Sequence, residues 1–270
     1  MKDNFKKIFY GNGEEQFGEL RLPEKGDGPF PIIVIIHGGF WKKAYDLKHI
    51  RPLANAFTSH GFVTWNIEYR RVGHVGGGWP GTFADVSAAL QYVEKLANLY
   101  PIDLERVVTL GHSAGGHLAL WVAAQENLHE NSPIRFEKNP LPVKGVLSLA
   151  GIGHLETMYQ IHHWEEKLFD SDVNPTRDLL GGTPAQYKER YEHGSPSTLL
   201  PISSNIVLIH GELDIAVPFA MSKMFDERAR ASGTKVELIP FRDLEHYAII
   251  QPDTKSWPVL LEKVQEIIRE

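Results

Sequence analysis

Short runs of apolar residues recur along the chain, and amphipathic stretches separate them. The clearest run, Ile32 to Ile36, is unbroken and β-branched, as expected for a strand buried on both faces. Gly18 to Leu22 has the length of an antiparallel entry strand. Similar runs predict five more strands, at Phe62 to Tyr69, Arg106 to Leu110, Val143 to Leu149, Asn205 to Ile209 and Lys235 to Ile239.

Apolar residues at steps of three and four predict helices between these strands. The stretches from Phe83 to Ala97 and from Trp257 to Ile268 each have one apolar face. Further helices are predicted from Ala114 to Gln125 and from Val217 to Ala229. Because strands and helices alternate, we predict an α/β fold with a mostly parallel sheet and helices on both faces. Residues 1–270 are interpreted as a single domain.

One segment, from Gly151 to Ile202, breaks this alternation. It runs for about fifty residues without a clear strand, which is long for a plain connection. We interpret it as a helical insertion that lies over one end of the sheet. Two roles stay open: the insertion only packs there, or it forms a cap that shapes a pocket.

Composition narrows the chemistry that the chain can perform. A length of 270 residues suits one large α/β domain, and 42% hydrophobic residues can form its core. The absence of cysteine excludes disulfides, cysteine nucleophiles, thiolate zinc sites and cysteine-bound iron–sulfur clusters. The net charge of -6 makes nucleic acids and anionic membranes poor partners.

The N-terminal residues are polar, and no apolar stretch of signal-peptide length follows them. The run from Ile32 to Ile36 is far too short to span a membrane. We therefore expect a cytoplasmic protein. No H-E-x-x-H or similar metal pattern occurs, so we expect neither a metal nor a cofactor. A homodimer is compatible with the sequence.

Residues 111–115 read Gly-His-Ser-Ala-Gly, which is the pattern G-x-S-x-G. The pattern follows a predicted strand and precedes a predicted helix, and this context is typical of a nucleophile elbow. There a strained turn lifts the hydroxyl of Ser113 above the sheet. The flanking glycines are expected because side chains would collide with the neighbouring strand or helix. A serine in a plain glycine turn is the weaker interpretation.

A serine hydroxyl needs a base, and the base needs an orienting carboxylate. In elbow proteins the order along the chain is Ser, then Asp or Glu, then His. Asp214 follows the strand at Asn205 to Ile209, and His246 follows the last strand. Glu212 is a rival acid, Asp214 could instead cap the next helix, and His246 could be an ordinary loop histidine. Together with Ser113 they predict a catalytic triad.

Hydrolysis of an acyl group also requires N–H donors for the developing oxyanion. One donor is expected at Ala114, directly after the nucleophile. A second is expected just beyond the strand at Ile32 to Ile36, where residues 37–41 read His-Gly-Gly-Phe-Trp. Two glycines allow the backbone to approach a bound acyl group closely.

The loop His37-Gly38-Gly39-Phe40-Trp41 resembles the HGGxW motif of the kynurenine formamidase-like esterases, which are relatives of the hormone-sensitive-lipase group. With the elbow, it identifies the chain as similar to the α/β-hydrolase superfamily over nearly its whole length. The resemblance implies an α/β-hydrolase fold with a short helical cap, oxyanion donors at Gly39 and Phe40, and a mainly structural Trp41. Other segments that resemble this branch are 77–80 with 85–86, 195–196 and 211–218; the last is shared with prolyl-oligopeptidase-like peptidases.

These observations predict a serine hydrolase, a carboxylesterase that cleaves small carboxylic esters. Trp41, Trp79 and Trp164 are candidates for the substrate pocket. Three alternatives stay open: an arylformamidase acting on N-formylkynurenine, an aminopeptidase of the prolyl-oligopeptidase type, and a binding module without catalysis. The aminopeptidase would need carboxylates for the substrate's amino terminus, and Glu165 with Glu166 is the available pair.

Overall fold

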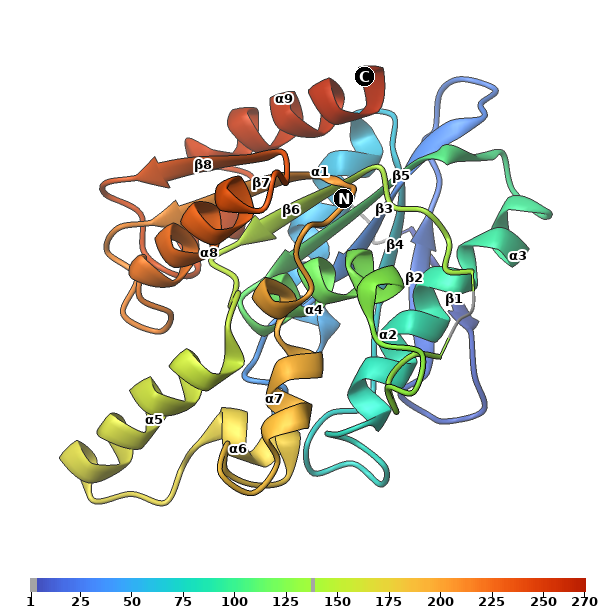
Figure 1. Ribbon diagram of the computed structural model, residues 1–270. Helices are drawn as coiled ribbons and strands as arrows, with labels where there is room; N and C mark the ends of the chain where they lie inside the picture. Colours follow the sequence, from blue (N-terminus) through green and yellow to red (C-terminus); the bar gives the residue numbers. More distant parts are fainter. Residues whose placement is uncertain (1–3, 137–138) are drawn as a thin grey trace.

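The computed structural model describes residues 4–136 and 139–270. Within them, one eight-stranded sheet runs through the molecule, with helices on both sides (Figure 1). The strands are β1 (Lys6–Phe9), β2 (Phe17–Arg21), β3 (Phe30–Ile36), β4 (Val63–Ile67), β5 (Ile102–His112), β6 (Gly145–Leu149), β7 (Asn205–Gly211) and β8 (Val236–Phe241). The α-helices are α1 (Arg51–Ser59), α2 (Gly81–Gln91), α3 (Val93–Ala97), α4 (Ala114–Ala123), α5 (Leu155–Phe169), α6 (Pro175–Leu180), α7 (Lys188–Gly194), α8 (Ala220–Ala231) and α9 (Ser256–Arg269).

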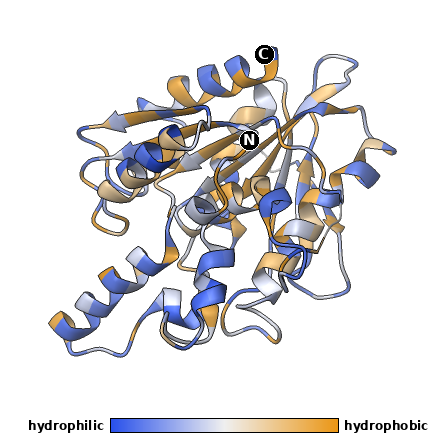
Figure 2. Ribbon diagram, viewed as in Figure 1, coloured by the Kyte–Doolittle hydropathy of each residue, from blue (hydrophilic) through white to orange (hydrophobic). Residues whose placement is uncertain are grey.

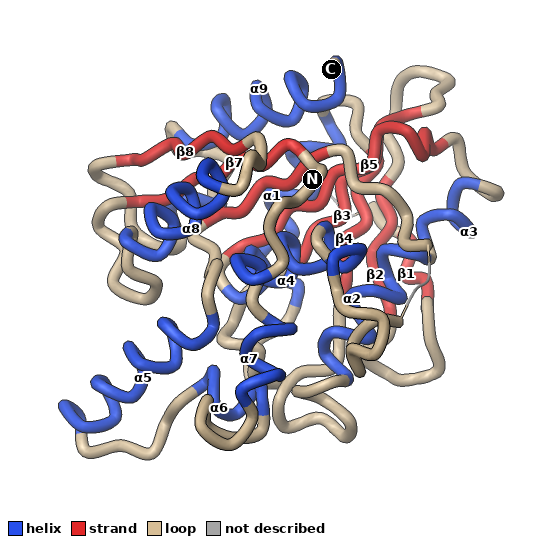
Figure 3. The backbone as a smooth tube through the Cα atoms, in the orientation of Figure 1, coloured by secondary structure: helices blue, strands red, loops and turns tan. Residues whose placement is uncertain are grey.

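The strands follow the order β1-β2-β4-β3-β5-β6-β7-β8. Strands β3 to β8 pair in parallel, while β1 and β2 pair antiparallel at one edge. Figure 3 shows this sheet in red between the blue helices. The predicted fold class and the antiparallel entry strand are confirmed. Because parallel strands place their carboxyl ends at one edge, the loops after β3, β5, β7 and β8 meet there.

Strand β3 shows how the sheet divides the core. Ile33 and Ile35 pack with α1 and α9 on one face, while Ile32, Val34 and Ile36 belong to the cluster on the face of α2, α4 and α8. This alternation follows from the two-residue period of a strand, and both faces are apolar because helices cover both. Figure 2 accordingly shows hydrophobic colours along the central strands.

Some elements differ from the sequence-based expectations. Strand β1 and helix α1 were not predicted from the sequence. Strand β1 has only four residues and no apolar run, and most of its residues are exposed. The helix expected from Phe83 to Ala97 is two helices, α2 and α3, which meet at Tyr92. Helix α8 begins at Ala220 instead of Val217, because the side chain of Asp214 accepts the N–H groups of Ala216 and Val217 in a turn.

Helices α5, α6 and α7 lie in the segment predicted as an insertion, between β6 and β7. Figure 1 shows α5 extending away from the sheet. The segment is tied to the loops near β3 and α2, since Trp79 donates its N–H to Leu179 and Lys42 faces Asp178 at 3.6 Å. Its role as a cap stays a prediction. Across the described ranges, no helix has the length and apolar character needed to cross a membrane.

Candidate functional site

Ser113 occupies the sharp turn between β5 and α4, with φ 56° and ψ -121°. This left-handed conformation is strained for a side chain with a Cβ. The expected need for glycine on both sides is confirmed. A Cβ on Gly111 would lie 2.0 Å from the carbonyl oxygen of Gly115, and one on Gly115 would lie 2.0 Å from that of Ile36. The backbone of β3 and the first turn of α4 therefore leave no room there.

The imidazole of His246 and the carboxylate of Asp214 form a short hydrogen bond. Nδ1 of His246 donates to Oδ2 of Asp214 at 2.6 Å, and both residues are buried. The other oxygen of Asp214 accepts the N–H groups of Ala216 and Val217, each at 2.9 Å. Asp214 thus holds the turn before α8 through one oxygen and orients His246 through the other. The alternative in which Asp214 caps the next helix is wrong, because the N-cap of α8 is Phe219.

The surroundings of Asp214 favour a charged carboxylate. Burial raises the pKa of Asp214, but hydrogen bonds from His210 and His246 lower it by more than burial raises it. The pKa of Asp214 therefore lies well below its usual range. His210 is itself held, since its Nδ1 contacts Ser222 at 2.7 Å. The rival acid, Glu212, is exposed and forms no hydrogen bond with His246 in the described part of the chain.

A cavity of about 230 Å³ lies over the elbow. Ser113 and His246 are on its walls together with Gly39 and Phe40 from the loop after β3. The remaining lining residues are Tyr45, His49, His112 and Tyr247. No hydrogen bond joins the Ser113 hydroxyl to His246 among the described residues, and such bonds are often long without a substrate. The cavity is smaller than most ligand pockets and therefore suits a small group.

Two of the candidate oxyanion donors, Gly39 and Phe40, line this cavity. Gly39, Phe40 and Trp41 have φ angles of 112°, 54° and 55°, so the loop after β3 is in a left-handed conformation at three successive residues. A Cβ on Gly39 would lie 2.3 Å from the Cβ of Tyr45, which explains a glycine there. Ala114 is the first residue of α4, and the first N–H groups of a helix have no acceptor within it.

The prediction that Trp41, Trp79 and Trp164 line the substrate pocket is wrong for this cavity, because none of them is on its walls. Trp41 is fully buried, with its ring edge-on to His117. Trp79 packs against Phe83. Trp164 is 69% exposed. It lies outside the buried stripe of α5, which consists of Leu155, Met158, Tyr159, His162 and Glu166.

Four lining residues were not anticipated from the sequence. His112 and Tyr247 directly precede and follow residues of the expected triad, and this adjacency was an available signal. The Nε2–H of His112 donates to the carbonyl oxygen of His246 at 2.9 Å, so it also anchors the loop after β8. Tyr45 and His49 come from the segment between β3 and α1, where no pattern marks them.

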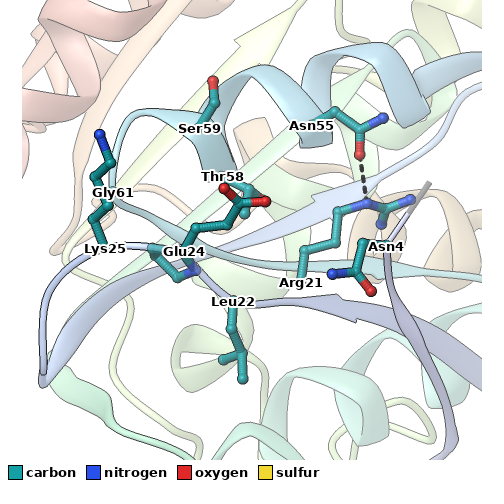
Figure 4. A pocket seen from close by; sticks show the side chains of 10 residues that line it. Asn4, Arg21, Leu22, Glu24, Lys25, Asn55, Thr58, Ser59 and Gly61 are labelled. Carbon is teal, nitrogen blue, oxygen red and sulfur yellow. Dashed lines mark hydrogen bonds between the residues drawn. The ribbon is translucent and has the colours of Figure 1, made fainter. Parts of the chain in front are cut away.

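A second, larger hollow of about 710 Å³ lies between the end of β2 and α1. Figure 4 shows Arg21 there, with its Nε–H donating to Asn55 at 2.7 Å. None of the residues predicted for chemistry lines this hollow, which is formed by Asn4, Arg21, Leu22, Pro23, Glu24, Lys25, Asn55, Thr58, Ser59 and Gly61. The smaller cavity at Ser113 is therefore the candidate site.

Comparison with known proteins gives a family and several esterases. The family model described as BD-FAE matches residues 19–229. Among curated proteins, a probable isoprenylcysteine alpha-carbonyl methylesterase of Oryza sativa is 22% identical over 92% of this chain and 59% of its own length. Esterase LipQ of Mycobacterium tuberculosis is 26% identical over 84% of this chain and 52% of its own length. The chain thus spans little more than half of these relatives.

Solved structures share the fold along the whole chain. A truncated carbohydrate esterase from gut microbiota superposes with a TM-score of 0.83 at 20% identity, covering 100% of this chain and 99% of the other. An esterase from Thermogutta terrifontis, solved with propionate bound, gives a TM-score of 0.74 at 21% identity, covering 98% and 93% of the two chains. At these identities the likeness is one of fold.

Proposed function

The chain belongs to the BD-FAE family, and from this premise we propose that it is a serine hydrolase that cleaves small carboxylic esters. The observation that carries the proposal is the 2.6 Å hydrogen bond between Asp214 and His246, at a cavity that Ser113 also lines. The curated relatives named as esterases support ester hydrolysis as the shared chemistry. This chain spans only part of the length of these relatives.

Acylation begins when the Oγ of Ser113 attacks the ester carbonyl carbon and His246 takes the hydroxyl proton. Asp214 keeps the Nδ1–H tautomer of His246 in place and stabilises the imidazolium. The carbonyl oxygen becomes negative in the tetrahedral intermediate, and N–H groups in the cavity stabilise it. The proposed donors to this oxygen are the backbone N–H groups of Gly39, Phe40 and Ala114.

The intermediate collapses when His246 returns the proton to the alcohol oxygen, which leaves. The acyl group then stays on Ser113 as an ester. A water molecule attacks this ester while His246 takes a proton from it. His246 then gives that proton to the Oγ of Ser113 as the acid departs, which restores the free hydroxyl. Each step moves one proton between the imidazole of His246 and an oxygen atom, so His246 acts in turn as base and as acid.

The shape of the cavity bears on the alternatives. Arylformamidase activity is the second candidate, because the same residues and a cavity of about 230 Å³ would also suit a formyl group. The aminopeptidase is disfavoured. Glu166 is engaged by Arg177 at 2.8 Å and, like Glu165, does not line the cavity.

We expect the activity to fall steeply as the acyl chain of the substrate lengthens. A cavity of about 230 Å³ has room for an acetyl group, whereas an octanoyl group would have to displace Tyr45 or Tyr247. The kcat/KM values of p-nitrophenyl acetate, butyrate and octanoate, measured beside N-formylkynurenine, give the profile. A roughly hundredfold preference for acetate over octanoate is expected.

The variant Tyr247→Ala should widen the cavity and raise the octanoate-to-acetate ratio about tenfold. Tyr187→Ala is the matched control, since Tyr187 does not line the cavity. A flat profile in the wild type would contradict the short-acyl preference. A preference for N-formylkynurenine over all three esters would replace the esterase by the arylformamidase.

The insertion at residues 151–202 is proposed to act as a cap beside this cavity. The ring of Phe40, in the oxyanion loop, lies 6.1 Å from that of His162 in α5, so that movement of α5 would reach the loop. A single domain over residues 1–270, a cytoplasmic location and a homodimer stay predictions from the sequence.

A further inference from the structure

His37 lies beneath the oxyanion loop, fully buried, and both of its ring nitrogens contact oxygen atoms. Nε2 is 2.8 Å from Oε1 of Glu68, and Nδ1 is 2.7 Å from the carbonyl oxygen of Gly38. A carbonyl oxygen can only accept, so Nδ1 must carry a proton. A neutral imidazole has one N–H group, whereas an imidazolium has two. The protonation state of His37 therefore depends on whether Glu68 accepts or donates in its hydrogen bond with Nε2.

The contacts of Glu68 are those of an ionised carboxylate. Its oxygens accept the N–H groups of Leu47 and Tyr69, each at 3.1 Å, and a guanidinium nitrogen of Arg71 lies at 3.1 Å. Burial raises the pKa of Glu68, whereas the charge of Arg71 and the backbone hydrogen bond from Tyr69 lower it. Glu68 is thus an acceptor, and Nε2 of His37 is the donor.

Charge balance supports the same state. Arg71 is buried and also pairs with Glu15 at 2.6 Å, so one guanidinium serves two carboxylates. A positive charge on His37 balances the carboxylate of Glu68, which shares Arg71 with Glu15.

The hydrogen bond from His37 bears directly on a candidate oxyanion donor. The carbonyl of Gly38 and the N–H of Gly39 belong to one trans peptide, in which the two groups point in opposite directions. A donor that holds the Gly38 oxygen therefore directs the Gly39 N–H to the opposite side. The preceding peptide is fixed as well, since the hydroxyl of Tyr69 donates to the carbonyl oxygen of His37 at 2.8 Å.

We propose that His37 is an imidazolium, paired with the carboxylate of Glu68, that orients and polarises the N–H of Gly39 toward the oxyanion. A charged donor on the carbonyl strengthens the N–H of the same amide as a donor. His37 and Glu68 act through Gly39, so they are positioning residues. The inference rests on the proposed function for its consequence in catalysis, but not for the charge state of His37.

Nuclear magnetic resonance tests the charge state in the wild-type protein. Long-range nitrogen–proton correlation spectra of the histidine rings, recorded at pH 7.5 and assigned through bonds, report whether each ring nitrogen carries a proton. We expect both nitrogens of His37 to be protonated. A spectrum in which Nε2 of His37 carries no proton would overturn the inference, whatever the enzyme does.

The variant Glu68→Gln tests the consequence, because a neutral amide at 68 leaves His37 neutral while its Nδ1–H can still reach Gly38. We expect kcat for p-nitrophenyl acetate to fall roughly tenfold with KM nearly unchanged, less than the loss of a whole oxyanion donor. Inhibition by a trifluoromethyl ketone, whose adduct carries the oxyanion, should weaken by a similar factor. Glu14→Gln is the matched control, since Glu14 is exposed and pairs with neither Arg71 nor His37 among the described residues, so both values should stay unchanged.

The outcomes separate this inference from the proposed function. If wild-type protein turns over esters but Glu68→Gln raises KM and leaves kcat unchanged, the inference fails and the function stands. If wild-type protein hydrolyses no ester, the proposed function fails, and the ring spectra still decide the state of His37. Should Glu68→Gln fail to fold, the spectra of the wild type decide alone.

Discussion

Replacement of Ser113 by alanine is expected to lower kcat for p-nitrophenyl acetate by roughly 10⁶-fold, the loss typical of a missing serine nucleophile. The variant keeps the oxyanion donors and the Asp214–His246 pair, but it has no oxygen on which an acyl-enzyme can form. The fold should persist, because alanine retains the Cβ and leaves both flanking glycines in place. Steady-state kinetics and a thermal unfolding curve measure the two effects.

A fluorophosphonate probe provides the second measurement of the same variant. It should label the wild type and fail to label Ser113→Ala. Ser203→Ala is the matched control, since Ser203 is exposed and its hydroxyl donates to Glu126. Labelling of Ser113→Ala, or activity near that of the wild type, would contradict Ser113 as the nucleophile. A wild type that takes no label would favour the binding-module alternative.

Asp214→Asn is expected to lower kcat by about 10⁴-fold. The carboxylate of Asp214 accepts the Nδ1–H of His246 and stabilises the imidazolium that forms in each step. An amide has the wrong charge, and its NH₂ group can favour the wrong tautomer of His246. Kinetics on p-nitrophenyl acetate measure the loss, and Glu212→Gln is the control for the rival acid, with activity within twofold of the wild type. A large loss at Glu212 instead would reassign the acid.

The same variant should change the response of the fold to acid. The pKa of Asp214 is lower in the folded chain than in the unfolded chain, so the folded state gains stability from its charge above the ordinary Asp pKa. This gain is lost as the pH falls through the lowered pKa. Chemical unfolding of wild type and Asp214→Asn at pH 7 should therefore differ more than unfolding under strongly acidic conditions.

Local patterns were sufficient for most of the sheet. The unbroken run from Ile32 to Ile36 predicts a strand buried on both faces, and alternate residues of β3 do enter separate clusters. Boundaries were less exact, since β4 is shorter than the run from Phe62 to Tyr69. Exposed or short elements such as β1 were missed, because a strand without an apolar run has no periodic signal.

The candidate site also contains residues that the sequence predicts and residues that it does not. Ser113, Asp214 and His246 each follow a strand and occur in the order that an elbow protein requires, so their association could be predicted without coordinates. The tryptophans could not be placed, because hydrophobicity alone does not say which side of a helix or loop faces a cavity. Trp164 illustrates this, since α5 turns it to the solvent.

The sequence by itself determined the fold class and indicated a candidate nucleophile with its expected partners, because strand periodicity, turn glycines and chain order are local properties. Only the tertiary structure decided which distant groups share a proton or a charge. The contact of His37 with Glu68 joins the ends of β3 and β4, which no local pattern relates. Such contacts depend on how β3 and β4 lie side by side in the sheet, and that arrangement follows from burial of both strands in one core.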